Sequence, residues 1–153
     1  MMGEAHDSRF ELRFVVLRHE DREGLHFDLM IESGERLATW KFPTAPESVS
    51  AGAAAASSLH WPPVLHGRRI GDHRRAYLTY EGPVSGDRGH VTRHDEGICR
   101  VDRPVAYDRE PAELSDSVER WCIEFCGRLL RGRFELVRDD DQESGWSLCC
   151  LEA

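Results

Sequence analysis

Three side chains near the N-terminus have the types and spacing of a metal site. His26 and Asp28 stand two residues apart, and His19 precedes them across a charged segment. On a strand, residues i and i+2 point to one face about 6.5–7 Å apart, so both can reach one ion at about 2.1 Å. Two imidazole nitrogens and one carboxylate oxygen suit Mn²⁺, Zn²⁺ or Fe²⁺. Three protein ligands leave positions for a phosphate oxygen and a water, the pattern of catalytic sites.

Glu32 lies two steps further along the face that would carry His26 and Asp28, and it is a candidate partner that orients one of the ligands. A simpler interpretation stays open for this segment. Histidines and aspartates also occupy the solvent-facing side of ordinary amphipathic strands, where they bind nothing.

A second polar cluster follows at residues 72–77, which read D-H-R-R-A-Y. A phosphoester reaction needs donors for the charge that develops on the phosphoryl oxygens and a proton source for the leaving oxygen. His73, Arg74, Arg75 and Tyr77 are of the right types for these roles. The alternative is a solvated basic loop that precedes a strand.

These residues must be positioned by β-structure, because the chain reads as short strands separated by turns. Residues 10–18 are rich in Val, Phe and Leu and predict a strand, and residues 20–24 predict a charged turn. Residues 25–32 alternate with a period of two, with Phe, Leu and Ile on one face and the polar residues on the other. Residues 36–42 follow a Ser-Gly-Glu turn and predict the hairpin partner.

Further strands are expected at residues 75–80, 90–93, 97–101, 121–126, 134–137 and 146–151. The Ala/Ser-rich segment 47–59 predicts a short helix or a surface loop, and residues 103–117 predict a loop. About eight short strands indicate a mainly β fold, a small antiparallel β-barrel with a short helix or two and long loops. We expect residues 1–9 to form a flexible tail and residues 10–153 to form a single domain.

Composition narrows the classes of protein. The chain has 153 residues, enough for one domain, and a net charge of −8, which argues against a protein that coats DNA through clustered cations. The only lysine, Lys41, is followed by Phe-Pro-Thr, which excludes ligases that carry a nucleotide on the lysine of a K-x-D-G motif. No long apolar run predicts a membrane span, and no apolar region near the N-terminus predicts a secretory signal, so we expect a cytoplasmic protein.

Several motifs, in order, resemble the 3'-phosphoesterase domain family of bacterial DNA ligase D. A strand and a His precede R-L-H-Y-D-F-R-L-E in that family, and residues 18–32 read R-H-E-D-R-E-G-L-H-F-D-L-M-I-E. The family hairpin L-x-x-W-x-V-P-x-x-P is matched by L-A-T-W-K-F-P-T-A-P at residues 37–46. D-H-P-L-D-Y-x-x-F-E-G is matched by D-H-R-R-A-Y-L-T-Y-E-G at residues 72–82. L-x-G-R-W-x-L-V-R is matched at residues 130–138, and the last W-L-L strand at 146–148. The resemblance covers about residues 10 to 151.

The resemblance implies a small antiparallel β-barrel with an active-site groove. It implies an enzyme that uses Mn²⁺ to remove a 3' ribonucleotide or a 3' phosphate from the end of DNA or a DNA–RNA primer during repair by non-homologous end joining. The implied metal ligands are His19, His26 and Asp28. The residues implied at the phosphate are His73 and Tyr77, which with His26 we expect to be catalytic. A separate ligase, polymerase or Ku-type end-binding protein is the expected partner.

The sequence departs from the family at three points. The family arginine two residues after the aspartate, which contacts the scissile phosphate, is Met30 here, and a family glutamate is Gly71. The spacing between the first two histidines is one residue longer, which shifts His19 unless Gly24 absorbs the extra residue in a bulge. Loss of an arginine at such a site can cost about 10²-fold in rate.

Two alternatives to an active enzyme on 3' ends follow from these departures. Arg22, Arg74 and Arg75 are the candidates to bind phosphate in place of the missing arginine. If none does so, the chain is a catalytically weakened module that binds a metal or a DNA end. The second alternative is a phosphoesterase for another, smaller substrate, which suits an acidic protein.

Overall fold

The computed structural model describes residues 9–50, 63–104, 113–115, 117–140 and 144–151, and the strands dominate them. The strands are β1 Arg9–Asp21, β2 Gly24–Ser33, β3 Arg36–Phe42, β4 Val64–Arg74, β5 Gly82–Pro83, β6 His90–Asp102, β7 Arg120–Gly127, β8 Arg131–Arg138 and β9 Gly145–Cys150. Two single 3₁₀ turns accompany them, η1 Pro46–Val49 and η2 Arg75–Leu78. None of the helices in these ranges has the length and apolar character needed to cross a lipid bilayer.

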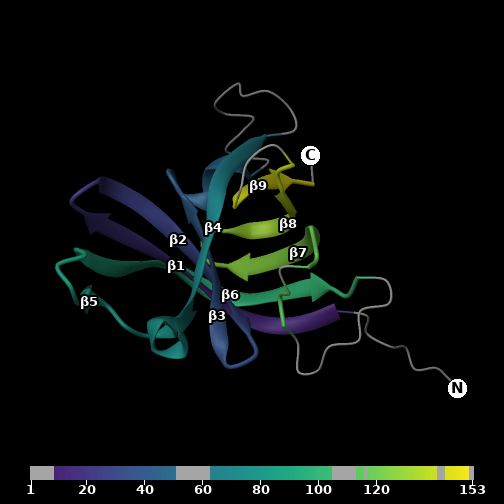
Figure 1. Cartoon of the computed structure of the whole chain (residues 1–153). Coiled ribbons are helices and arrows are strands. Elements are labelled where there is room, and N and C mark those ends of the chain that lie inside the picture. The colour runs from purple at the N-terminus through teal and green to yellow at the C-terminus, as the bar shows by residue number, and fades with distance from the viewer. Residues whose placement is uncertain (1–8, 51–62, 105–112, 116, 141–143, 152–153) are drawn as a thin grey trace, which may run out of the picture.

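Eight of the strands in the described residues form a closed antiparallel barrel. Their order is β1-β2-β3-β4-β9-β8-β7-β6, and β6 pairs back with β1 to close the ring. The two-residue strand β5 pairs with β6 alone. Figure 1 shows the β1–β2 hairpin running out to one side of the barrel, beside the segment that carries β5. The prediction of a mainly β fold with a small antiparallel barrel is confirmed.

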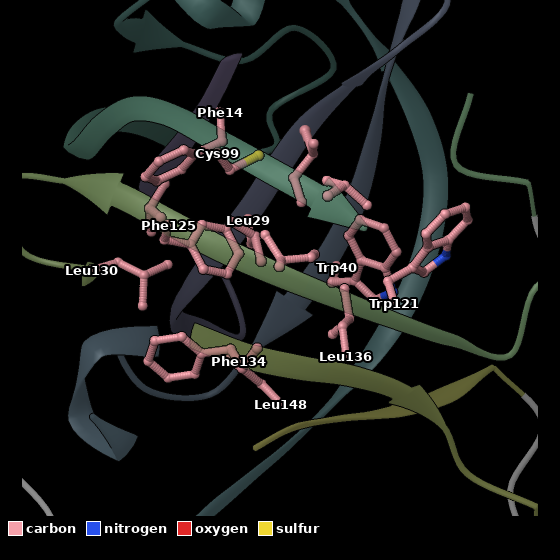
Figure 2. Packing of buried hydrophobic residues seen from close by; sticks show 14 of the residues in the cluster. Phe14, Leu29, Trp40, Cys99, Trp121, Phe125, Leu130, Phe134, Leu136 and Leu148 are labelled. Carbon is pink, nitrogen blue, oxygen red and sulfur yellow. The ribbon is translucent and has the colours of Figure 1, made fainter. Parts of the chain in front are cut away.

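The interior of the barrel is filled by large apolar side chains. Five of these side chains, from five different strands, are each at most 1% exposed: Phe14, Leu29, Trp40, Trp121 and Phe134. Figure 2 shows these rings and branched chains pointing toward one another between the strands. Because the interior is packed with side chains, it leaves the outer surface of the barrel as the place for a binding site.

A second apolar cluster lies on the opposite face of the same strands, outside the barrel. Its members alternate with the interior residues along β1, β2 and β3, or come from the segment between β4 and β6 and the start of β6: Val15, Leu17, Met30, Leu37, Leu78, Val84 and Val91. η2 and the residues around β5 therefore form an outer layer over β1–β3. Polar side chains on this outer face are partly withdrawn from water, unlike those on an ordinary barrel surface.

Three predictions of strands are wrong in detail. Residues 64–74 form β4 although no strand was predicted there, because β4 is mostly polar and presents few apolar side chains. Residues 75–78 form the 3₁₀ turn η2 rather than a strand, and this turn buries Leu78 in the outer cluster. The separate strands predicted at residues 90–93 and 97–101 are one strand, β6, with an irregularity opposite Val16 and Leu17.

The hairpin predicted between residues 25–32 and 36–42 is confirmed as β2–β3. The apolar face of β2 packs in the barrel interior as expected, but the face that carries His26 and Asp28 is buried as well. The start of the segment 47–59, predicted as a short helix or a loop, forms the 3₁₀ turn η1. Residues 51–62 lie outside the described ranges. Most of the expected loop at 103–117 and of the tail at 1–9 also lies outside them, and Arg9 already belongs to β1.

A buried carboxylate holds the turn between β7 and β8. Asp95 is 2% exposed and accepts four backbone N–H bonds of 2.7–3.2 Å, from Glu96, Arg128, Leu129 and Leu130. Hydrogen bonds to a charged acceptor are stronger than neutral ones, and donors left without an acceptor in the interior are costly.

We therefore expect Asp95→Ala to lower the free energy of unfolding by about 3 kcal/mol, because one buried and three partly buried backbone donors lose their charged acceptor. Urea denaturation followed by circular dichroism measures this change. Asp102→Ala is the matched control, because the Asp102 side chain is 46% exposed and its loss should cost less than about 0.5 kcal/mol. Equal stability of the two variants would contradict a structural role for the Asp95 carboxylate.

Candidate metal centre on the outer face of the barrel

The tight hairpin between β1 and β2 places the two histidines opposite each other. Asp21 pairs with Gly24, so the turn consists of the two residues between them, and Gly24 has a φ of +120°. From there the pairing runs without a register shift, so that His19 is the Cα partner of His26. The two ring centroids are 4.5 Å apart. The extra residue between the histidines is therefore accommodated in the turn, and no bulge in β2 is needed.

Asp28 completes the predicted group from the next outward position of β2. Its Oδ2 lies 3.2 Å from Nδ1 of His19, and its Oδ1 lies 3.4 Å from Nε2 of His26. Atoms bound to one ion at about 2.1 Å are about 3.0–3.4 Å apart in octahedral or tetrahedral geometry. The structure thus brings the three predicted ligands together, with a different oxygen of Asp28 facing each histidine.

Asp21 is a further candidate ligand that the sequence interpretation missed. Ligand atoms of His19, Asp21 and His26 all lie within 4.8 Å of one another, and the Asp21 Oδ2 is 3.9 Å from Nδ1 of His26. Asp21 had been assigned to the charged turn, whereas it is the last residue of β1. Its position two residues after His19 was the available signal, because that spacing puts both side chains on one face of a strand.

A backbone carbonyl fixes the orientation of the His19 ring. Nε2 of His19 lies 2.7 Å from the carbonyl oxygen of Arg88, and only a protonated nitrogen can bond to a carbonyl. Nε2 therefore donates, which leaves Nδ1 on the side of Asp28 as the nitrogen available to an ion. Bonds of this kind from the second ring nitrogen are typical of metal-binding histidines.

Contacts within this group shift the pKa values of His19, Asp28 and Asp21. The hydrogen bond to Asp28 raises the pKa of His19 above its ordinary value, against the effect of partial burial. Burial disfavours the charged form of Asp28, yet the hydrogen bond with His19 and the nearby His26 ring outweigh burial and keep the pKa of Asp28 below its ordinary value. A hydrogen bond from the Glu23 N–H lowers the pKa of Asp21. Both carboxylates are therefore ionised at neutral pH.

An unpaired oxygen supports the fit to a cation. Asp28 is 2% exposed, and its Oδ1 has no hydrogen-bond partner among the described residues. Buried carboxylate oxygens nearly always have a partner, and a divalent cation would provide one here. Two imidazole nitrogens with one or two carboxylates are a donor set that suits Mn²⁺ or Zn²⁺.

His73 reaches the same group through a bulge in β4. Thr39 pairs with Ile70, but Leu37 pairs with His73, so β4 has one more residue than β3 over this stretch. The extra residue reverses the alternation and turns His73 to the outer face, where it lines one pocket with His19, His26 and Asp28. Burial lowers the pKa of His73, and its Nδ1 is buried without a hydrogen-bond partner in the described part of the chain.

The pocket that contains these groups has a volume of about 300 Å³. It is lined by the four candidate ligands, by His73 and Ile70, and by charged residues of the two adjoining loops and β3: His19, Asp21, Arg22, Glu23, His26, Asp28, Lys41, Ile70, His73, Asp87 and Arg88. Lys41 stands opposite Asp28 in the β2–β3 pairing. The sequence interpretation did not assign Lys41 a role in binding, although its place facing residue 28 follows from the predicted hairpin.

Other predicted residues lie outside this pocket. Tyr77 packs edge-on against His73, with ring centroids 5.6 Å apart, and lines a separate pocket together with Arg74. Arg75 forms an ion pair of 2.6 Å with Glu32, whose other oxygen accepts the backbone N–H of Arg13. Of the three phosphate-binding candidates, Arg22 alone lines the pocket, and it is paired with Asp87.

Met30 does not face the pocket either. It is 1% exposed and belongs to the outer apolar cluster with Leu17 and Leu37. A side chain at this position packs beneath the outer layer, so Met30 serves stability in this chain.

Comparison with known proteins does not assign the chain to a family. No family model matches the sequence, and no curated protein matches it.

The ligand set can be tested by metal titration. We expect His26→Ala and Asp28→Asn to abolish tight Mn²⁺ binding, because the first removes a donor atom and the second removes the negative charge while it keeps the buried shape. Asp21→Ala should weaken binding about 10- to 100-fold if its carboxylate joins the ion or orients a ligand. Isothermal titration calorimetry gives the affinities, with Asp102→Ala as the control. Unchanged affinity in His26→Ala would rule out this centre.

Gly89 controls the approach of the loop that holds His19. Its φ is +80°, and a Cβ at this position would overlap the carbonyl oxygen of Glu20. Gly89→Ala should therefore displace the Arg88 carbonyl from His19, lower the free energy of unfolding by more than about 2 kcal/mol and weaken Mn²⁺ binding about tenfold. Gly71→Ala is the control, because a Cβ at Gly71 meets no atom within 4 Å. Denaturation and calorimetry on both variants check this, and indistinguishable behaviour would refute it.

Proposed function

We propose that the protein is a metal-dependent phosphoesterase that acts on the 3' ends of nucleic acid and removes a terminal ribonucleotide or phosphate. The observation that carries the proposal is the single pocket that contains His19, His26, Asp28, His73 and Lys41. The order of the sequence motifs supports the choice of nucleic-acid ends. The place of the pocket on the outer face of the barrel also supports it, because a polymer end can reach an open surface.

The residues of the pocket fit the steps of phosphoester hydrolysis. His19, His26 and Asp28, with Asp21 beside them, would hold a divalent cation, which when bound acts as a Lewis acid and activates water. Lys41 and Arg22 would neutralise charge on the phosphate oxygens, the role that an arginine at position 30 has in the resembling family.

His73 is the candidate to move a proton. Its lowered pKa keeps the imidazole neutral at neutral pH, so it can accept a proton from an attacking water or donate a hydrogen bond to the phosphate. Tyr77 would act by holding the His73 ring, because it contacts that ring and lines a different pocket. Tyr77 is therefore a positioning residue in this proposal.

One observation favours a second candidate function. Met30 and Tyr77 stand at positions that contact phosphate in the resembling family, and in this chain neither lines the pocket. Fewer groups would then stabilise the transition state than in an efficient phosphoesterase. The second candidate is a module that binds a metal and a nucleic-acid end and hydrolyses that end slowly or not at all.

A primer–template duplex separates the two functions. The primer carries a 5' label and ends in one 3' ribonucleotide or in a 3' phosphate, and products are resolved on a gel with and without Mn²⁺. We expect Mn²⁺-dependent shortening or dephosphorylation, reduced by at least about 10²-fold in His26→Ala because the metal is lost.

Asp102→Ala is the control for this assay, because its side chain lies away from the pocket residues, and it should retain full activity. Persistent activity in His26→Ala would show that the proposed site is not responsible. Binding of the duplex end without any product would favour the binding module.

A further inference from the structure

A second pocket adjoins the candidate metal centre and has no part in the proposed chemistry. Its volume is about 410 Å³, within the range of small-molecule sites. It is lined by the end of β3, the middle of β4 and the start of β2: Glu23, Gly24, Leu25, His26, Lys41, Phe42, Pro43, His66, Gly67 and Arg68. His26, Lys41 and Glu23 line both pockets, so a ligand that extends beyond the metal centre enters this one next. We call it the side pocket.

One wall of the side pocket is apolar and rigid. Leu25 is 43% exposed, one of five large apolar side chains in the described residues with such exposure, and it lines the pocket with Phe42 and Pro43. A Cβ on Gly67 would overlap the Phe42 ring and the Lys41 carbonyl oxygen, so Phe42 lies directly against the backbone of β4. A flat apolar group placed on this wall would cover Leu25 and remove its surface from water.

The opposite side of the side pocket is cationic. Lys41 and Arg68 face each other across the β3–β4 pairing. Like charges at directly opposed positions of paired strands are destabilising, and an anion between them relieves this cost. The contact of Lys41 with Glu23 is a loose 4.0 Å, and the described residues place no carboxylate within ion-pair distance of Arg68. Lys41 and Arg68 are therefore suited to bind phosphate oxygens together.

We propose that the side pocket binds the terminal nucleoside of a nucleic-acid 3' end. The base would rest on Leu25 and Pro43, and the phosphate at the metal centre would lie beside Lys41. Arg68 would contact the sugar–phosphate backbone of the nucleic acid. The neighbouring apolar wall and cationic edge match the two halves of a nucleotide, a flat ring system and a phosphodiester. This inference rests on the proposed function and adds recognition of the base to it.

The test compares duplex ends that differ only in the terminal base. Two labelled primer–template duplexes end in a ribonucleotide or in the same unit without its base, each joined by a phosphorothioate that slows hydrolysis. Fluorescence anisotropy with Mn²⁺ gives the affinity of the full chain for each. We expect the end with a base to bind about tenfold tighter than the abasic end, from burial of the base and Leu25.

Matched variants assign this preference to the side pocket. Leu25→Ser should bring the ratio between the two ends close to one, while Leu129→Ser, at an exposed leucine of the β7–β8 turn, should keep it. Arg68→Ala should weaken the binding of both duplex ends equally, about three- to tenfold. Arg120→Ala, at the exposed start of β7, should leave the affinity for both ends unchanged.

The outcomes separate this inference from the proposed function. Equal affinity of the wild-type protein for both ends, or a ratio that survives Leu25→Ser, overturns the side-pocket proposal. If the standard primers are still hydrolysed in that case, the phosphoesterase proposal stands alone. If the base preference is present and depends on Leu25 but no primer is hydrolysed, base recognition is supported and the catalytic proposal fails.

Discussion

The buried carboxylate of Asp28 is the constraint on which the rest of the site depends. A carboxylate with almost no exposure must be matched by positive charge, because an unpaired buried charge is costly. His19 and His26 lie on either side of it at 3.2 and 3.4 Å, and Lys41 stands opposite on β3. The low exposure of the Asp28 side chain reduces the screening of its charge, which strengthens its attraction for a cation in the pocket.

Three local backbone features build that environment. The two-residue turn after Asp21 sets His19 against His26, and the bulge in β4 turns His73 outward. Gly89 lets its loop approach β1 so closely that the preceding carbonyl reaches His19. The site thus depends on backbone geometry at two turns and a bulge as much as on the side chains that face it.

The strands with strict alternation could be predicted from the sequence, and with them the placement of His26 and Asp28 on one face of β2. The strand β4, which pairs with β3 and β9 in the ring, could not be located in the same way, because it lacks an apolar period and buries only Leu65. Asp21 was missed because β1 runs further than predicted, so that a residue assigned to the turn shares a face with His19. Lys41 was missed although its place opposite Asp28 follows from the predicted hairpin. The burial of Met30 depends on an outer layer supplied by residues far along the chain.

The two apolar clusters on opposite faces of β1–β3 have a consequence for metal choice. The candidate ligands on β2 alternate with Phe27 and Leu29, whose side chains are anchored in the barrel interior. The ligand atoms are therefore preorganised by the packing of the core, so little conformational entropy is lost when they gather around an ion. A rigid group of this kind discriminates by ionic radius, and it would disfavour a large ion such as Ca²⁺, which needs six to eight oxygen ligands.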